Sequence, residues 1–335
     1  MNPSLRKALS ATGPLVGLLF VYMLFAGLTS WQGAESCDAF LSLYNSKTIL
    51  TQAIIVAIGA LGMTLVIIAG GIDLSVGSQI ALGTVVIGWC LRAYGGDAAG
   101  VGLSLGAAAL GILACGACGL LNGLMSALFR IVPFIITLGM MQIARGVAKW
   151  IAEEQTIVTP DSMLFEVMVV EPTPDATFSV APGIWVAVAL IVLVVLTLRF
   201  TVFGRYVFAI GSNEATARLC GINVTLHRVW IYTLCGLLTG VAGVMQFANL
   251  TVGDPTAAVG MELDIIAAVV IGGGSLSGGE GSAIGSVVGA LIMAVLRNGC
   301  TMVGVPNFVQ DIVIGVIIIS AVGVDRLKHR ATAAG

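Results

Sequence analysis

Apolar runs of about 20 residues, long enough to cross a bilayer as helices, recur along almost the whole chain. Glycine, proline and charged residues gather in the shorter segments between these runs. The pattern predicts about ten spans, the eighth short enough to be a half-helix. The predicted spans are 14–31, 49–69, 76–94, 101–128, 133–151, 182–199, 229–250, 262–274, 282–302 and 308–324. We therefore expect an all-α polytopic membrane protein, with residues 1–335 forming a single transmembrane domain.

Residues 59–83 interrupt this pattern, because two apolar runs meet there at a glycine pair that polar side chains follow. The residues that we single out in this first break are Gly70, Gly71, Asp73, Ser75 and Ser78. Backbone that leaves a helix at membrane depth must be covered by protein or line a water-filled path, and an ionisable residue there is by default functional. The residues alone leave two interpretations open: a functional break, or a short turn at the membrane surface with Asp73 capping the next helix.

Residues 261–291 repeat this arrangement of an apolar run, glycines, hydroxyl groups and one carboxylate. The second break that they form contributes Gly273, Gly274, Ser275 and Ser277 as candidate site residues. Paired interruptions in the two halves of a transporter often mark its substrate site. The alternative is that both stretches share only the glycine content that lets membrane helices pack closely.

Basic residues between the predicted spans fall almost entirely on one side of the membrane. These are Arg6, Lys7, Arg130, Arg199, Arg205, Arg218, Arg228, Arg326, Lys328 and Arg330. Because basic loops stay in the cytoplasm, both termini are predicted to be cytoplasmic. The exceptions lie close to span ends, where we expect them to snorkel, and are Lys47, Arg92, Lys149 and Arg297.

The loop 152–181 lies on the opposite side and has acidic residues but no basic one: Glu153, Glu154, Asp161, Glu166, Glu171 and Asp175. We predict that this loop lies on the outer surface. It is either a solvated connection or a docking surface for an external partner.

The largest cytoplasmic segment covers about residues 200–228. Within it, Ser212 or Asn213 can cap a short helix over 214–219, which Gly221 can end at the C′ position. The segment is either a simple connector or a docking site for another cytoplasmic protein.

Composition fits this topology and excludes several functions. Of 335 residues, 58% are hydrophobic and only 10% are charged, whereas soluble domains carry about a quarter charged residues. The composition therefore predicts a protein of the lipid bilayer, and a net charge of −2 gives no electrostatic footprint for nucleic acid. The sequence has no GxxxxGK[ST] phosphate loop, and we expect the chain itself to bind no cofactor.

Groups that could serve catalysis or metal binding are scarce in the predicted spans. Both histidines, His227 and His329, lie in cytoplasmic segments, and we interpret all seven cysteines as small apolar residues. Neither a catalytic residue nor a metal site is therefore expected. The best intramembrane carboxylates are Asp264 and Asp311, with Arg145 as a candidate partner. So few carboxylates argue against a proton- or sodium-coupled carrier, and the amide side chains in the spans suit an uncharged polar solute.

Four stretches of the chain carry a resemblance to a known family. They read GMTLVIIAGGIDLSVGS at 62–78, GLLNGLMSALFRIVPFIITLGMMQIARGVA at 119–148, FAIGSNEATARLCGINV at 208–224 and MELDIIAAVVIGGGSLSGGEGS at 261–282. They resemble the membrane permease subunits of bacterial ABC importers for monosaccharides, the family of the ribose, galactose, xylose and galactofuranose permeases. The chain departs from the family at Gly211-Ser212, where two glycines are common, and at 272–274, where Gly-Gly-Thr is common.

The resemblance implies a multi-pass permease subunit in the bacterial inner membrane, which translocates a monosaccharide delivered by a periplasmic binding protein. It also implies two cytoplasmic ATP-binding subunits, which use the ATP, and a second permease copy or paralogue. The alternative function is a self-sufficient secondary carrier or facilitator for a small polar solute.

The resemblance also ranks the open interpretations. Residues 211–221 match the coupling region of the family, so docking to the ATP-binding subunits is favoured over a simple connector. The expected coupling residues are Arg205, Asn213, Glu214, Arg218 and Gly221. Both breaks are expected to border the translocation path or its gate. Asp73 is expected to hold the first break through backbone N–H groups rather than to contact sugar.

Overall fold

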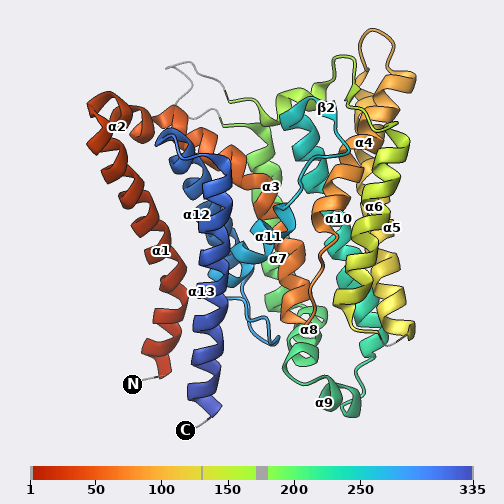
Figure 1. The fold of residues 1–335 in the computed structure, drawn as a ribbon. Coiled ribbons are helices and arrows are strands. Elements are labelled where there is room, and N and C mark those ends of the chain that lie inside the picture. The colour runs from red at the N-terminus through yellow and green to blue at the C-terminus, as the bar shows by residue number, and fades with distance from the viewer. Residues whose placement is uncertain (1–2, 130, 171–179, 334–335) are drawn as a thin grey trace.

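Helices make up nearly all of the computed structural model, which describes residues 3–129, 131–170 and 180–333. Most of the long helices lie roughly along one common axis, as in a bundle that crosses a bilayer (Figure 1). Among the described residues, eight helices are long and apolar enough to span a membrane. They are α1 (Pro3–Gln32), α3 (Leu43–Ile68), α4 (Val76–Tyr94), α5 (Val101–Phe129), α6 (Pro133–Ile151), α7 (Pro182–Phe200), α10 (Val224–Leu250) and α12 (Ala283–Met302). The prediction of an all-α polytopic membrane protein is confirmed.

The other two predicted spans differ from these eight helices. α11 (Met261–Ile271) has 11 residues and is therefore about 16 Å long, roughly half the thickness of the hydrocarbon core. The expectation of a half-helix at the eighth span is confirmed. α13 (Asn307–Ala333) is continuous, and its apolar part covers Asn307–Ser320.

Short elements connect the long helices. α2 (Ala34–Leu41) follows α1, while α8 (Val202–Ser212) and α9 (Glu214–Leu219) join α7 to α10. Both termini lie at the same end of the bundle as α8 and α9 (Figure 1), which agrees with an even number of crossings. Arg130, one of the basic residues behind the predicted orientation, lies outside the described residues.

The predicted outer loop is more ordered than a solvated connection. Its β1 (Ile157–Val158) pairs with β2 (Val252–Gly253), and η1 (Met163–Met168) follows. Leu164 and Met168 of η1 are buried, so apolar side chains fix this part of the loop onto the helix ends. Glu171 and Asp175 lie outside the described residues.

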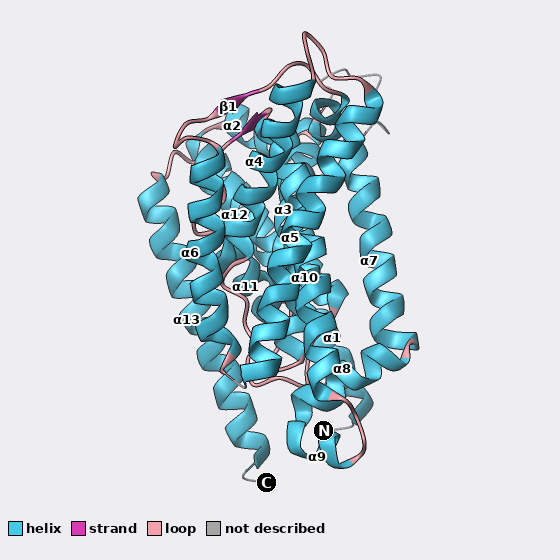
Figure 2. Cartoon of the chain, turned by 90° about the vertical axis from the view of Figure 1, so that its right-hand side faces the viewer, coloured by secondary structure: helices cyan, strands magenta, loops and turns pink. Residues whose placement is uncertain are grey.

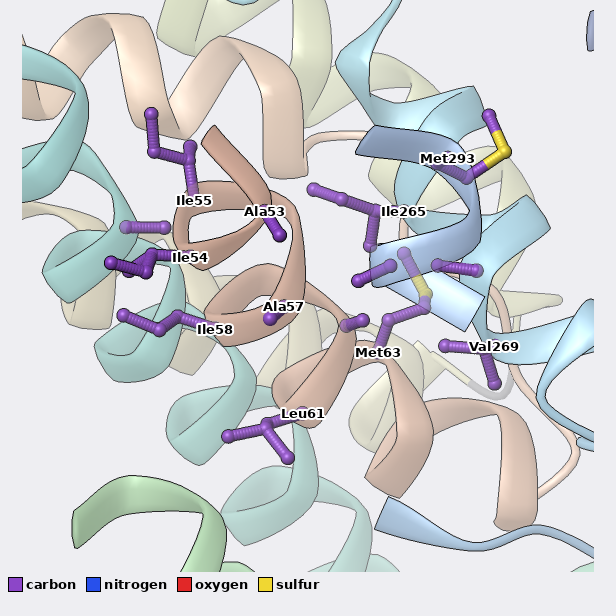
Figure 3. Close-up of a cluster of buried hydrophobic side chains, with 14 of the residues drawn as sticks. Ala53, Ile54, Ile55, Ala57, Ile58, Leu61, Met63, Ile265, Val269 and Met293 are labelled. Atoms are coloured by element: carbon purple, nitrogen blue, oxygen red, sulfur yellow. The ribbon is translucent and has the colours of Figure 1, made fainter. Parts of the chain in front are cut away.

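The centre of the bundle is α3. Of its most apolar window, 89% is buried inside the chain, against 22% for α6 and α7 and 11% for α1. Figure 2 shows α7 on one side of the bundle, away from α6 and α13. Figure 3 shows Ala57 and Met63 of α3 in the same buried cluster as Ile265 and Val269 of α11. The half-helix α11 is thus held by the most buried helix of the fold.

Glycines let α5 and α10 approach to backbone contact. A Cβ added to Gly119 of α5 would overlap the Tyr232 carbonyl oxygen and lie 3.0 Å from the Gly236 Cα atom. A Cβ added to Gly240 of α10 would likewise lie 2.6 Å from the Ile112 Cα atom of α5. Close approach of this kind is the main source of attraction between helices in lipid, where burial of apolar surface adds little.

Gly119→Leu should therefore push α5 and α10 apart and lower the thermal unfolding midpoint in detergent. Overpacking costs about 1–3 kcal/mol, and backbone contacts can relax less than side chains do. Gly106→Leu is the matched control on α5, because a Cβ there meets nothing within 4 Å. Equal unfolding midpoints for the two variants would contradict the packing described here.

Candidate functional site

The first break begins where α3 ends. Gly70 has φ +80, and its N–H donates to the Ile67 carbonyl (2.9 Å) while the Gly71 N–H donates to the Val66 carbonyl (2.9 Å). These two bonds form a Schellman motif, in which glycine takes the left-handed position at no steric cost. The chain then runs from the lower end of α3 back toward the middle of the bundle, where α4 starts (Figure 1).

Asp73 and Ser75 hold the non-helical stretch before α4. Asp73 is fully buried and accepts from the Ser75 N–H (2.9 Å) and the Ser75 hydroxyl (2.5 Å). Ser78 is buried in the first turn of α4 and donates to the Ser75 carbonyl (2.8 Å). Because Asp73 has no exposed surface, the interpretation as a turn at the membrane surface is wrong. Its carboxylate holds a backbone N–H that the break has freed.

Two amide side chains complete this buried network. Asn122 of α5 donates to the Ser75 hydroxyl oxygen (3.0 Å) and approaches Asp73 (3.4 Å), and Gln79 donates to the same hydroxyl oxygen (2.7 Å). Asn122 is one of the amide side chains of the predicted spans that were expected to suit a polar solute, and Gln79 was not singled out. The sequence did not show that both amides bind Ser75. The i, i+4 spacing of Ser75, the N-cap residue of α4, and Gln79 does indicate that these two residues share a face.

The second break lies against the first. The Gly279 N–H donates to the Ile68 carbonyl at the end of α3 (2.8 Å), and a Cβ on Gly278 would lie 2.9 Å from the Gly70 Cα atom. Of the predicted residues, Gly273 has φ +93 and Ser275 is buried. Gly274 and Ser277 lie in the same loop, where the Ser277 N–H donates to the Ser275 hydroxyl oxygen (3.3 Å). The structure therefore brings the two breaks together.

The end of α8 touches both breaks. A Cβ on Gly211 would overlap the Ile68 carbonyl oxygen and would lie 2.7 Å from the Gly279 backbone nitrogen. Gly278 in turn faces the Gly211 carbonyl oxygen. We call this meeting of Ile68–Gly70, Gly211–Ser212 and Gly278–Gly279 the glycine junction. It joins α8 directly to the two interruptions of the membrane helices.

The short helix α9 forms as predicted. The Asn213 side chain accepts from the Thr216 N–H (2.9 Å) at its start. At its end the Gly221 N–H donates to the Arg218 carbonyl and the Ile222 N–H donates to the Ala217 carbonyl, a second Schellman motif with Gly221 at φ +83. All seven cysteines are free, and Cys220, beside this motif, is exposed rather than an apolar core residue.

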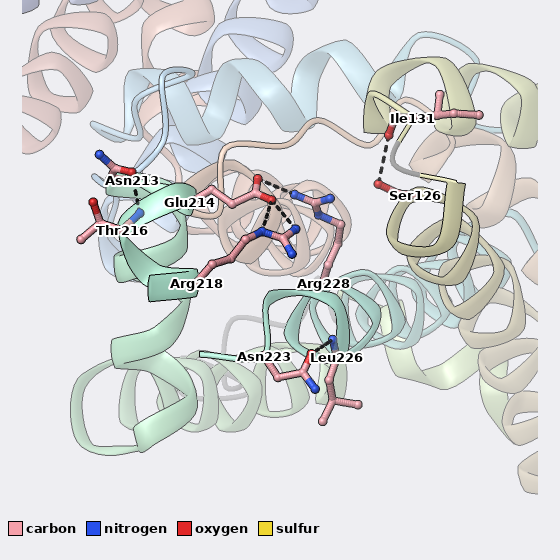
Figure 4. Close-up of polar contacts among 9 residues, drawn as sticks. All are labelled: Ser126, Ile131, Asn213, Glu214, Thr216, Arg218, Asn223, Leu226 and Arg228. Carbon is pink, nitrogen blue, oxygen red and sulfur yellow. Dashed lines mark hydrogen bonds and ion pairs between the residues drawn. The ribbon is translucent and has the colours of Figure 1, made fainter. Parts of the chain in front are cut away.

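Glu214 ties α9 to α10. Its carboxylate pairs with Arg218 (2.7 Å) one turn along α9 and with Arg228 (2.8 Å) in the first turns of α10 (Figure 4). Partial burial raises the pKa of Glu214, but the hydrogen bonds and charges of the two arginines outweigh it and hold that pKa below its usual value. Arg228 was not predicted as a partner, and Arg205 lies exposed on α8 outside this ion-pair cluster.

A cavity of about 320 Å³ connects the ion-pair cluster to the first break. Its lining includes Gly70, Gly71, Val132, Glu214, Arg228 and Tyr232. The Tyr232 hydroxyl is buried without a hydrogen-bond partner among the described residues, and a Cβ added to Gly71 would lie 2.4 Å from its oxygen. Movement of α9 relative to α10 would therefore change the space around Gly70 and Gly71.

The charges inside the bundle pair differently from the prediction. Asp264 of α11 is bound by Arg297 of α12 (2.7 Å), not by Arg145. Arg145 instead donates to the carbonyl groups of Pro255 and Ala257 (2.9 and 2.7 Å). Arg297 was expected to snorkel toward the membrane surface, but its guanidinium instead binds Asp264 of the half-helix α11. Lys47 is buried as well.

The site joins the charged segment α8–α9, a cavity and two glycine-rich breaks. The described residues contain no group of three or more His, Cys, Asp or Glu side chains that could hold a metal ion.

Asp73→Ala should destabilise the fold, because the Ser75 N–H and the Ser75 hydroxyl would be left without their acceptor in the interior. Such a loss costs about 1–3 kcal/mol and should lower the thermal unfolding midpoint. Asp97→Ala removes an exposed carboxylate from the loop between α4 and α5 and is the control. An unchanged midpoint in Asp73→Ala would show that the carboxylate does not hold the break.

Comparison with known proteins places the chain in a family. A family model described as the permease component of branched-chain amino acid transport systems matches residues 45–322. The ribose import permease protein of Escherichia coli strain K12 is 39% identical over 294 residues, which cover 87% of this chain and 88% of that protein. The fructose import permease protein of Rhizobium meliloti is 37% identical over 300 residues, covering 88% and 81%. No solved structure matches the chain.

A third relative, the ribose import permease protein of Bacillus subtilis strain 168, is 37% identical and covers 94% of this chain and 92% of that protein. The resemblance drawn from the four sequence stretches is thereby confirmed over nearly the whole length. Eight long apolar helices and the match over 45–322 agree. The chain therefore belongs to the family of multi-pass membrane permease components of transport systems, together with import permeases for ribose and fructose.

Proposed function

We propose that this chain is the permease subunit of an ATP-driven importer, and that it translocates a monosaccharide delivered by a periplasmic binding protein. It works with a second permease copy and with two cytoplasmic ATP-binding subunits, which hydrolyse the ATP. The observation that carries this proposal is the glycine junction. Through it, a segment suited to docking an ATP-driven partner contacts both breaks in the membrane helices.

The choice of a sugar rests on relatives and on the chemistry of the breaks. The relatives named above import ribose and fructose, and a permease of Azospirillum brasilense that is 33% identical is named for L-arabinose. The breaks offer hydroxyl groups, amides and backbone groups, which suit a neutral polar solute. The family description names branched-chain amino acids, but their zwitterionic backbone would favour paired charges along the path.

The basic residues support the orientation. Arg199, Arg205, Arg218 and Arg228 belong to the α7–α10 connection, at the end where both termini lie (Figure 1). The positive-inside rule favours the cytoplasm for this end. The opposite end, with Glu153 and Glu154, is then the face toward the binding protein.

Coupling follows from the contacts of α8 and α9. When ATP draws the ATP-binding subunits together, α9 is pulled, and Glu214 carries the force to Arg228 on α10. The last turn of α8 carries it through Gly211 to Ile68 and Gly279. Gly70, Gly71, Asp73, Ser75 and Ser78 then act as one side of the gate, and Gly273, Gly274, Ser275 and Ser277 as the other.

Reconstitution in liposomes tests the function. With its ATP-binding subunits and binding protein, the chain should take up D-ribose, L-arabinose or D-fructose only when ATP is present on the side of α9. Liposomes that contain this chain alone should show no uptake. Sugar flux through the chain alone would instead identify a self-sufficient carrier and overturn the proposal.

Arg218→Glu should abolish association with the ATP-binding subunits, measured by pull-down. The variant places a second carboxylate beside Glu214 and reverses the charge of an exposed docking residue. Arg92→Glu reverses an exposed charge on the last turn of α4, at the far end of the bundle, and should leave association unchanged. Full association and transport in Arg218→Glu would show that α9 does not dock the ATP-binding subunits.

A further inference from the structure

The ion-pair cluster of α9 and α10 has one positive charge in excess. Glu214 binds both Arg218 (2.7 Å) and Arg228 (2.8 Å), so a single carboxylate faces two guanidinium groups (Figure 4). A guanidinium has five N–H donors. Among the described residues, Arg228 donates only through Nη2, to Glu214. Arg228 therefore has both charge and donors left for a second anion.

The cavity beside this cluster is large enough for such an anion. Glu214, Arg218 and Arg228 all line it, and its volume of about 320 Å³ lies at the lower end of the range of about 300–1,000 Å³ for small-molecule sites. The Arg228 side chain is only 18% exposed. Partial removal from water strengthens the attraction of its charge for an anion.

A buried hydroxyl in the same cavity also lacks a partner. Tyr232 lies one turn after Arg228 on α10, so both residues share a face of the helix, and both line the cavity. Tyr232 is only 3% exposed, and its hydroxyl has no hydrogen-bond partner among the described residues. It lies beside Gly71, which lines the cavity as well. Since buried polar groups are normally hydrogen-bonded, this hydroxyl indicates a ligand in the cavity.

The spacing of these donors indicates the kind of ligand. Arg228 and Tyr232 leave α10 about 6 Å apart, which is more than one small ion can bridge. Guanidinium groups prefer phosphate or carboxylate oxygens, whereas a phenol hydroxyl pairs with a neutral hydroxyl. A phosphate group has three acceptor oxygens and can bind two guanidinium groups at once. A phosphate ester that also carries hydroxyl groups satisfies both ends of the cavity.

We propose that this cavity binds a phosphate ester of a polyol, with the phosphate group on Arg218 and Arg228 and a hydroxyl group on Tyr232. The ligand is distinct from the carried solute, because a neutral sugar cannot use the excess charge. Two sources offer this chemistry: a soluble sugar phosphate, and the glycerol phosphate headgroup of a lipid, which basic pockets between membrane helices can bind. The inference rests on the proposed function only for the orientation, which places the cavity on the cytoplasmic side.

A bound phosphate ester would act on coupling. Its phosphate group competes with Glu214 for Arg228 and so loosens the link between α9 and α10. Its polyol part fills space beside Gly70 and Gly71. A sugar phosphate therefore slows uptake. Phosphorylation of the imported sugar would supply this ligand, so a product of the next reaction would limit its own supply.

Thermal unfolding of the purified chain in detergent tests the site without any transport assay. At about a hundredfold excess over its Kd, D-ribose 5-phosphate should raise the unfolding midpoint by a few degrees. Inorganic phosphate should raise it less, and D-ribose should leave it unchanged. No shift with any phosphate compound, including the lipid below, would overturn the proposal, and an equal shift with D-ribose would overturn the anionic ligand.

A lipid arm of the same experiment separates the two sources. Short-chain phosphatidylglycerol carries a glycerol phosphate headgroup, and short-chain phosphatidylcholine is its control without headgroup hydroxyls. A shift with D-ribose 5-phosphate supports the soluble ligand. A shift with phosphatidylglycerol alone supports the site with a lipid in it and overturns regulation by a sugar phosphate.

Tyr232→Phe tests the contact with the least disturbance of the fold. The variant keeps the ring and removes an unpartnered hydroxyl, so the unfolding midpoint without ligand should not fall. Affinity for the phosphate compound that shifts the parent chain should fall about three- to tenfold, the effect of one hydrogen bond. Tyr206→Phe is the matched control, because Tyr206 packs against His227 outside the cavity lining. Equal affinities of the parent chain and Tyr232→Phe would overturn the site.

Arg228→Gln tests the charge. The variant should lose most of the shift that the phosphate compound produces, whereas Arg199→Gln, which removes an exposed arginine from the end of α7, should keep it. A full shift in Arg228→Gln would contradict the proposed phosphate contact. If Arg228→Gln does not fold, Tyr232→Phe still decides.

Uptake by reconstituted complexes tests the regulation. D-Ribose 5-phosphate on the side of α9 should slow the uptake of D-ribose, and the Tyr232→Phe complex should need about three- to tenfold more of it. Uptake that is insensitive to D-ribose 5-phosphate would overturn the regulatory role. If the parent complex moves none of D-ribose, L-arabinose and D-fructose, the proposed function fails, whereas the thermal shifts still test the site.

Discussion

The absence of water from the hydrocarbon core governs this structure. Every N–H and C=O group that leaves a helix there needs a partner in the protein, and the chain leaves its helices more than once. At the first break Gly70 and Gly71 bond back to α3, and Asp73 receives the Ser75 N–H. At the second, Gly279 bonds to the same end of α3. This hydrogen bond from the second break to the end of α3 holds the two interruptions together.

Glycine makes this close approach of the two breaks sterically feasible. Three segments meet at the glycine junction with backbone against backbone, and a side chain at Gly211 or Gly278 would separate them. The contact also has a mechanical consequence, because α8 cannot shift without moving both breaks. Glu214 adds a second link through Arg228, so the α8–α9 segment is attached to the membrane helices at two points.

Local patterns predicted much of this fold correctly. The spans, the half-helix α11 and the capped helix α9 follow from hydrophobic run length and from residues such as Asn213 and Gly221, which act within one or two turns. Asp73 was correctly expected to bind backbone N–H groups. Its full burial was not foreseen, because the sequence alone could not tell a surface turn from an interior break.

The sequence by itself determined that the chain crosses a membrane, where its helices break and which family it resembles. Only the tertiary structure decided which distant groups meet. Asp264 pairs with Arg297 and not with Arg145, and Asn122 binds Ser75. Gly211 contacts both breaks. Helix formation depends on neighbours within a few residues, whereas these pairings depend on how helices far apart in sequence pack in space.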